Sequence, residues 1–170
     1  MTKAARNWLA VVTCVVAALT CGGCGSTKDE PMRVMAEDEA TRIAEQHAQA
    51  VIKVIAPAQK PDPGGSGSAP CEGRGGEIAK DGRYYVQHIY QVPVSPDRQI
   101  ATLERLRDHW RQAGYEIQRF RVFPDGKGGE VAARNAQDGY QISVETTDPP
   151  TAVSLAVYSP CLMPPGKVSG

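Results

Sequence analysis

The chain has 170 residues and a formal net charge of zero, with 19 basic and 19 acidic residues. This length suits one domain with a real hydrophobic core and is short for two. The charge balance gives no electrostatic footprint for nucleic acid, so no nucleic-acid partner is expected. No apolar run reaches the roughly 20 residues of a membrane-spanning helix, so we expect an exported or tethered chain that does not span a membrane.

The N-terminus has the three parts of an export signal. Lys3 and Arg6 give a positive start, an uncharged apolar run covers 9–19, and two glycines precede Cys24. We therefore expect a lipoprotein signal peptide over 1–23, with lipid attached to Cys24, because a free thiol near an exported N-terminus is a liability. The alternative is an ordinary secretory signal that leaves this thiol free.

The first part of the mature chain is predicted to be a tether, a helix and a linker. Residues 24–32 are polar, and 33–56 carry apolar residues at three- and four-residue steps, which is typical of an amphipathic helix. Pro57 ends this helix. Pro, Gly and Ser dominate 57–70, so we expect an extended or flexible linker there. Whether the helix docks on the domain that follows or forms a mobile stalk stays open.

A compact domain is expected over 71–164, with a tail over 165–170. Aromatic and branched residues alternate over 84–94 and predict a strand. Ser95 followed by Pro and Asp is typical of a helix start, and Gly114 of its end.

Four more strands joined by short turns are predicted after this helix. The first of them, 115–123, changes its apolar phase between Ile117 and Phe120, which indicates a bulge. Short connections favour antiparallel pairing. The predicted fold is therefore α+β: an antiparallel meander packed against one or two helices and closed by one disulfide.

The cysteines predict that disulfide. Cys14 and Cys21 lie in the signal peptide and Cys24 is the lipid site, which leaves Cys71 and Cys161. An even pair in an exported domain favours a bond. We expect the two Cα atoms to lie within about 7 Å.

An ordered set of packing and turn residues runs through the compact domain: Leu103-x-x-Leu106, Trp110, Gly114-Tyr115, a Gly-rich turn and Ser159-Pro160-Cys161. In this set, over about 84–164, the chain resembles a loose group of actinobacterial exported lipoproteins of uncharacterised function. The resemblance implies an exported α+β domain with a structural cysteine. It implies no activity and transfers no catalytic residue.

Residues that carry reaction chemistry are sparse. The histidines, His47, His88 and His109, have no metal-ligand spacing, so neither a metal nor a cofactor is predicted. We expect His47 to be a boundary residue, His88 a sheet residue with satisfied hydrogen bonds, and His109 a solvated residue. No Gly-x-Ser-x-Gly elbow follows a strand, and we expect no enzyme activity.

Four residues are candidates for a binding surface. Tyr90 and Trp110 would line an apolar pocket between helix and sheet. Arg119 and Arg121 share one face of their strand, which would present a basic surface to an anionic partner or an envelope polymer. The alternative for the arginines is an ordinary solvated strand face.

The leading functional hypothesis is a lipid-anchored cell-envelope protein on the outer face of the cytoplasmic membrane. It would act by binding or scaffolding, without catalysis, toward another envelope protein or a polymer. The alternative is a small domain that binds or senses a ligand in a pocket between helix and sheet. A hydrolase is the third hypothesis.

Overall fold

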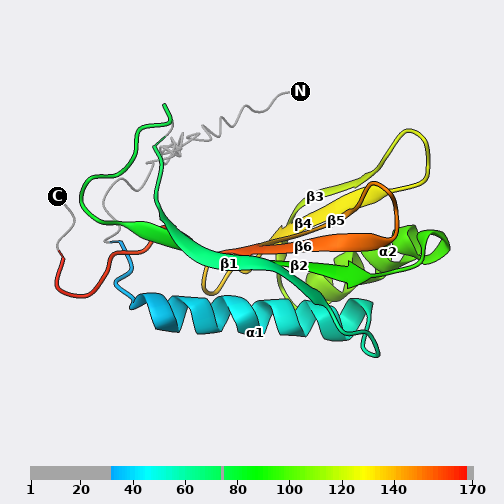
Figure 1. The fold of residues 1–170 in the computed structure, drawn as a ribbon, viewed down its shortest axis with the longest axis horizontal. Helices are drawn as coiled ribbons and strands as arrows, with labels where there is room; N and C mark the ends of the chain where they lie inside the picture. The colour runs from blue at the N-terminus through cyan, green and yellow to red at the C-terminus, as the bar shows by residue number, and fades with distance from the viewer. Residues whose placement is uncertain (1–31, 74, 168–170) are drawn as a thin grey trace, which may run out of the picture. The chain divides into compact units, whose positions relative to one another are not determined.

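The structure, a computed structural model, describes residues 32–73 and 75–167. The predicted signal peptide 1–23 and lipid attachment at Cys24 lie outside the described residues. The described chain forms two helices and a six-stranded antiparallel sheet, which confirms the predicted α+β fold (Figure 1).

Short connections join most of the elements, and a longer one, 71–83, joins β1 to β2. In chain order they are α1 (Glu37–Ile55), β1 (Asp62–Pro70), β2 (Tyr84–Pro93), α2 (Pro96–Gln112), β3 (Glu116–Val122), β4 (Gly129–Arg134), β5 (Gln141–Thr146) and β6 (Ala152–Tyr158). The sheet order is β1-β2-β6-β5-β4-β3, and each neighbouring pair is antiparallel. The strands after α2 thus form a meander that ends against β2.

Both helices cover the same face of the sheet. α1 packs against β2 and β6, α2 packs against β3 and β4, and the helices also contact each other (Figure 1). The inward side chains of the central strands are fully buried under them, among them Val131, Ile142, Val144, Leu155 and Val157. The opposite face of the sheet has no helix of the described chain over it.

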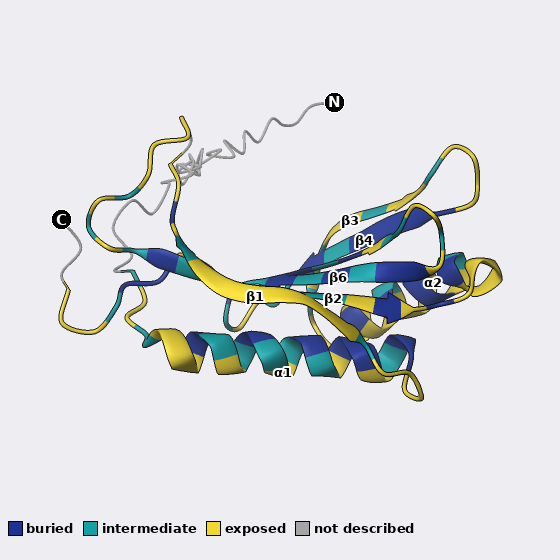
Figure 2. Cartoon of the chain, in the orientation of Figure 1, coloured by how far each residue is buried: buried dark blue, intermediate teal, exposed yellow. Residues whose placement is uncertain are grey.

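Helix α1 docks on the sheet, which answers the question that the sequence left open. Ala40, Ala44 and Ala48 are completely buried along one stripe, and their small side chains let the helix lie close to the strands (Figure 2). The helix begins at Glu37, later than predicted, because the residues before it are extended: Val34 forms a parallel bridge with Met163.

The prediction of an extended or flexible linker over 57–70 is wrong for residues 62–70. Residues 62–70 form β1, which pairs along its whole length with β2 and is the exposed edge of the sheet (Figure 2). The backbone ladder holds this segment although its Gly, Ser and Pro residues give it no apolar pattern. The compact body therefore does not begin at Cys71 but includes α1 and β1.

The predicted start and end of α2 and the irregularity in β3 are confirmed. Pro96 is the first helical residue after Ser95, although the serine side chain makes no cap hydrogen bond. Gly114 has a φ of 80°, the left-handed conformation that ends a helix. The register of β3 against β4 shifts between Ile117 and Arg119, as expected for a bulge.

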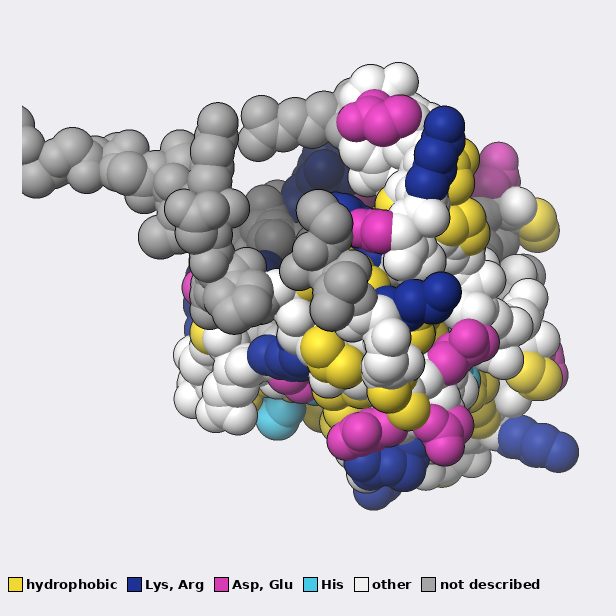
Figure 3. Space-filling model, turned by 90° about the vertical axis from the view of Figure 1, so that its left-hand side faces the viewer, with side chains coloured by type: hydrophobic (Ala, Val, Ile, Leu, Met, Phe, Trp, Pro, Cys, Tyr) yellow, Lys and Arg dark blue, Asp and Glu magenta, His cyan; other side chains and the backbone are white. Residues whose placement is uncertain are grey.

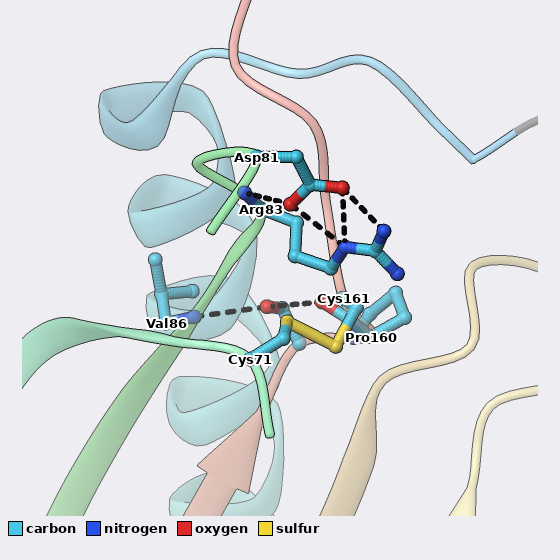
Figure 4. Close-up of a disulfide and its surroundings, with 7 residues drawn as sticks. Cys71, Asp81, Arg83, Val86, Pro160 and Cys161 are labelled. Carbon is cyan, nitrogen blue, oxygen red and sulfur yellow. Dashed lines mark hydrogen bonds and ion pairs between the residues drawn. A yellow bond between two sulfur atoms is a disulfide. The ribbon is translucent and has the colours of Figure 1, made fainter. Parts of the chain in front are cut away.

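The predicted disulfide is present. Cys71 and Cys161 are bonded, with their Cα atoms 6.0 Å apart (Figure 4). Beside this bond, the Ser159 hydroxyl accepts a hydrogen bond from the Val86 backbone N–H (2.9 Å) and donates to the Pro160 carbonyl (2.8 Å). The Ser-Pro-Cys motif is therefore a structural feature that anchors the end of β6 to β2.

Candidate functional site

The uncovered face of the sheet is ordered in rows that cross the strands. From β2 to β3, the register aligns one row of long side chains, which consists of Gln87, Tyr158, Gln141, Arg134 and Glu116. The next row contains Ile89, Ala156, Ser143, Ala132 and Arg119. A third row contains Gln91, Ser154, Glu145, Glu130 and Arg121.

The middle row has the smallest side chains at its centre. Ala156, Ser143 and Ala132 stand between rows that carry amides, an aromatic ring and charged groups, and all three are half-buried. We call this row of small side chains the trough: its floor is these three residues, and the longer side chains of Ile89 and Arg119 stand at its ends. A hollow of about 220 Å³ covers the Arg119 end of the trough, lined by Gln118, Arg119, Ala132, Gln141, Ile142, Ser143 and Tyr158.

An aromatic surface flanks the trough. Tyr158 lines the hollow, and its ring centroid lies 6.3 Å from that of Tyr85 on the neighbouring strand β2. Both rings are half-exposed on the uncovered face. Tyr158 offers flat apolar surface with a polar tip to whatever occupies the trough, and Tyr85 extends this aromatic surface away from the trough.

The arginines of this face are paired with acidic residues. Arg119 and Arg121 both contact the nearly buried Glu130, at 3.3 Å and 2.9 Å, the second contact being an ion pair without hydrogen-bond alignment. Arg134 contacts Glu116 at 3.3 Å. The strongly basic face expected from the two β3 arginines is therefore largely neutralised, although both arginine side chains remain about 60% exposed (63% and 60%).

Acidic and basic groups are also mixed elsewhere on the surface. In the view onto the end of the body where α1 begins, acidic, basic and apolar side chains lie next to one another (Figure 3). Independently of this view, the first turn of α1 carries Glu37, Asp38 and Glu39. No single charge sign dominates this view.

The other two predicted surface residues lie on the covered side of the sheet. Trp110 is only 2% exposed and stacks on Tyr115 at 6.1 Å between ring centroids, so the prediction that it forms a binding surface is wrong. Tyr90 is half-buried, and its hydroxyl donates a hydrogen bond to the Glu45 carboxylate of α1. Neither Tyr90 nor Trp110 lines the hollow at the trough or the one between α1 and β2.

Glu45 gathers three polar groups at the junction of α1 and β2. Its carboxylate accepts hydrogen bonds from Tyr90 and from Gln49 (2.7 Å) and lies 3.1 Å from His88 Nδ1. Burial raises the pKa of Glu45, but these hydrogen bonds and the His88 charge outweigh burial and hold it below its usual value. Burial and the same carboxylate raise the pKa of Tyr90 to about 12.

His88 is not the fully satisfied sheet residue that the sequence predicts. Its side chain is 9% exposed, and its Nε2 atom is buried without a hydrogen-bond partner among the described residues. It borders an open hollow of about 620 Å³ between α1 and β2, whose other lining residues are Glu37, Asp38, Thr41, Arg42 and Glu45. This arrangement could hold a small polar ligand.

His47 lies on the other flank of α1. Its Nε2 atom is 2.8 Å from the Asp138 carboxylate in the turn between β4 and β5, and its ring lies 5.1 Å from that of Tyr140. Tyr115 approaches Nδ1 at 3.4 Å. This residue joins α1 to the sheet, in keeping with the predicted boundary role, and His109 is exposed.

The described residues offer no nucleophile–base pair that would support the hydrolase hypothesis. Their hydrogen bonds include none between a histidine and a Ser, Thr or Cys side chain. Within 32–73 and 75–167, no three His, Cys, Asp or Glu side chains are grouped so that they could hold a metal ion. No helix of the described chain is long and apolar enough to cross a membrane.

Comparison with known proteins gives no match: no family model, no curated protein and no solved structure matches the chain. Inferences about function therefore rest on the residues and their geometry.

Sequence reasoning missed the trough. Its signal is weak: a small residue at an outward position of each of three strands, Ala132, Ser143 and Ala156. Each is ordinary in its own strand, and only the strand register places them in one row.

Proposed function

We propose that the chain is a lipid-anchored cell-envelope protein with a non-enzymatic binding role on the outer face of the cytoplasmic membrane. The positive start, the short apolar run and the small residues before Cys24 support the anchor. The Cys71–Cys161 bond suits an oxidising compartment outside the cytoplasm. The eight-residue separation between Cys24 and Met32 would keep the body within about 26–29 Å of the lipid.

The observation that carries the binding role is the uncovered face of the sheet. Both helices lie on the other face, and this one carries a trough flanked by tyrosine, glutamine and arginine side chains. Such a mixture of apolar floor and few convergent polar groups is typical of binding sites.

The anchor is tested in cells with the full-length, C-terminally tagged chain. We expect the wild type to be labelled by an alkyne fatty acid and to sediment with membranes, and Cys24→Ala to lose both properties. Cys21→Ala is the matched control and should keep both. A Cys24→Ala chain that stays on the membrane would exclude lipid anchoring through this residue.

The binding role is tested in the same cells by crosslinking and affinity capture. A dominant envelope partner that is lost with Cys24→Ala would support a tethered binding module. Capture that is equal for wild type and Cys24→Ala would contradict the need for the anchor.

A second candidate function is the binding of a small ligand beside α1. His88 favours it, because this residue lines the hollow at Glu45 and its buried Nε2 atom has no hydrogen-bond partner within the described part of the chain. A polar metabolite mixture that raises the Tm of the wild type, but not that of His88→Asn, would support this function. No rise in Tm with the wild type would argue against it.

A further inference from the structure

We infer that the trough binds a neutral glycan chain that lies across the strands. This inference rests on the proposed function, since the anchor would place the trough among the polymers of the cell envelope. It names the class of partner that the uncovered face takes.

The dimensions of the trough suit a short stretch of a polymer. Its floor residues Ala156, Ser143 and Ala132 lie on three adjacent strands, and strands lie about 4.7–4.9 Å apart, so the open floor is about 10 Å long. Ile89 and Arg119 bound this floor at its two ends.

The chemistry of the walls suits hydroxyl groups on a carbon ring. Gln87 and Gln141 each offer an amide that donates and accepts hydrogen bonds, which matches a partner that carries both functions at every hydroxyl. Tyr158 provides flat apolar surface with a polar tip, suited to the carbon face of a sugar ring.

The charges of this face favour a neutral occupant over a strongly charged one. The strands β3, β4 and β5 present three arginines and three glutamates here, which are Arg119, Arg121, Arg134, Glu116, Glu130 and Glu145. Arg119 and Arg121 are already engaged by Glu130, and Arg134 by Glu116. A polyanion would have to compete with these contacts, whereas a neutral chain leaves them in place.

An extended peptide is a poorer fit to the trough than a glycan. Peptides add to sheets at their edges, where main-chain groups are free. In the trough the backbone groups of β2, β6, β5 and β4 are already paired on both sides within the sheet. The main chain of a peptide would find only side-chain partners there.

The test is sedimentation of the detergent-solubilised full-length protein with cell-wall glycan that has been freed of protein and lipid. The variant Ala156→Tyr fills the centre of the floor, and we expect it to lower binding by about tenfold or more, a change of ~1.4 kcal/mol. Ser154→Tyr is the matched control: it places the same side chain on the same strand and face, one row outside the trough, and should bind within about twofold of the wild type. Both substitutions favour strand structure, and equal Tm values would show that the fold is kept.

Salt separates a neutral glycan from an anionic polymer. Binding to a neutral chain should change by less than about twofold between 0.05 and 0.5 M NaCl, because screening acts only on charges. Loss of binding at high salt would overturn the inference, and so would Ala156→Tyr that binds like the wild type. If the wild-type protein does not bind the glycan but is still fatty-acylated, the glycan inference is overturned and the proposed anchor is left intact.

Discussion

Single polar residues join helix α1 to the sheet. Tyr140 is completely buried, and its hydroxyl donates a hydrogen bond to the Ala40 carbonyl in α1 at 2.9 Å. On the other flank, the Glu45 carboxylate of α1 accepts a hydrogen bond from Tyr90 and contacts His88, both on β2. Buried polar groups need such partners, so these contacts restrict α1 to one position on the sheet.

Tyr140→Phe should lower the free energy of unfolding by about 1 kcal/mol at pH 7, because it removes this hydrogen bond from the core. Burial, with a contribution from Asp138, raises the pKa of Tyr140 to about 12. The folded state therefore holds a proton that the unfolded chain loses near pH 10, so the wild type loses stability as the pH rises from about 10 toward 12. The variant lacks this loss. In urea unfolding, the difference in free energy of unfolding between wild type and variant should therefore become smaller in that pH range. Tyr85→Phe, on the uncovered face, is the control; a gap that widens above pH 10 would contradict the argument.

Glu45→Gln should make stability less sensitive to acid. The pKa of Glu45 is lower in the folded state than in the unfolded chain. The ionised carboxylate therefore stabilises the fold above the pKa of the unfolded chain, and this stabilisation is lost as the pH falls through the pKa of the folded state. We expect the urea midpoint of the wild type to fall more between pH 5 and pH 3 than that of the variant. At pH 7 the variant should be less stable by about 1 kcal/mol, because a charged hydrogen-bond acceptor becomes neutral. The control Glu104→Gln, at an exposed position, should have the same pH dependence of the urea midpoint as the wild type. If the midpoint of Glu45→Gln falls as steeply as that of the wild type between pH 5 and pH 3, the role of this carboxylate is refuted.

At the scale of elements, β1 shows how pairing can override composition. Its sequence, Asp-Pro-Gly-Gly-Ser-Gly-Ser-Ala-Pro, offers no alternation and little side chain to bury, yet it pairs with β2 from Asp62 to Pro70. The ladder is interrupted between Pro63 and Gly65, where Gly65 has a φ of 136°. An edge strand of this kind contributes backbone hydrogen bonds and almost no hydrophobic burial.

Two glycine substitutions distinguish a strand from a flexible linker. A Cβ atom added at Gly67 would meet no other atom within 4 Å, and this glycine has an ordinary φ. Gly67→Thr should therefore stabilise the protein by about 0.5–1 kcal/mol, through higher strand propensity and a less flexible unfolded chain. Gly65→Thr should destabilise it by about 1–2 kcal/mol, because its φ of 136° strains a branched side chain. Urea unfolding of both variants measures the difference, and unchanged stability in both would indicate that the segment is not held in the sheet.

The elements differ in how far the sequence predicts them, for physical reasons. β2 and α2 have regular apolar periods and clear ends, so pattern alone locates them. The short turns of the meander favour antiparallel neighbours and thus the sheet. β1 carries no such pattern because its partner supplies the order. The trough also escapes prediction, since Ala132, Ser143 and Ala156 share a row only through a register that the sequence does not contain.

The fold of the whole body brings segments that are distant in the sequence to one end. Val34 bridges to Met163, Tyr84 pairs with Leu162, and Cys71 is bonded to Cys161. The chain entering α1, the stretch between β1 and β2 and the stretch after β6 therefore meet at the same end, next to the Asp81–Arg83 pair (Figure 4). The trough crosses the middle of the sheet, away from these junctions.

The disulfide should make the largest single contribution to the stability of this end. It closes a loop over a sequence separation of 90 residues, and in the chain-entropy model a loop of this size contributes about 4–5 kcal/mol by restricting the unfolded chain. The double variant Cys71→Ser/Cys161→Ser should lose stability of this order in urea unfolding at pH 7, and reduction of the wild type should give the same midpoint. Because β1 ends at Pro70, directly before the bond, hydrogen exchange of 62–70 should accelerate more than that of β4 and β5 in the double variant. Uniform acceleration across the sheet would show instead that the bond stabilises the body only as a whole.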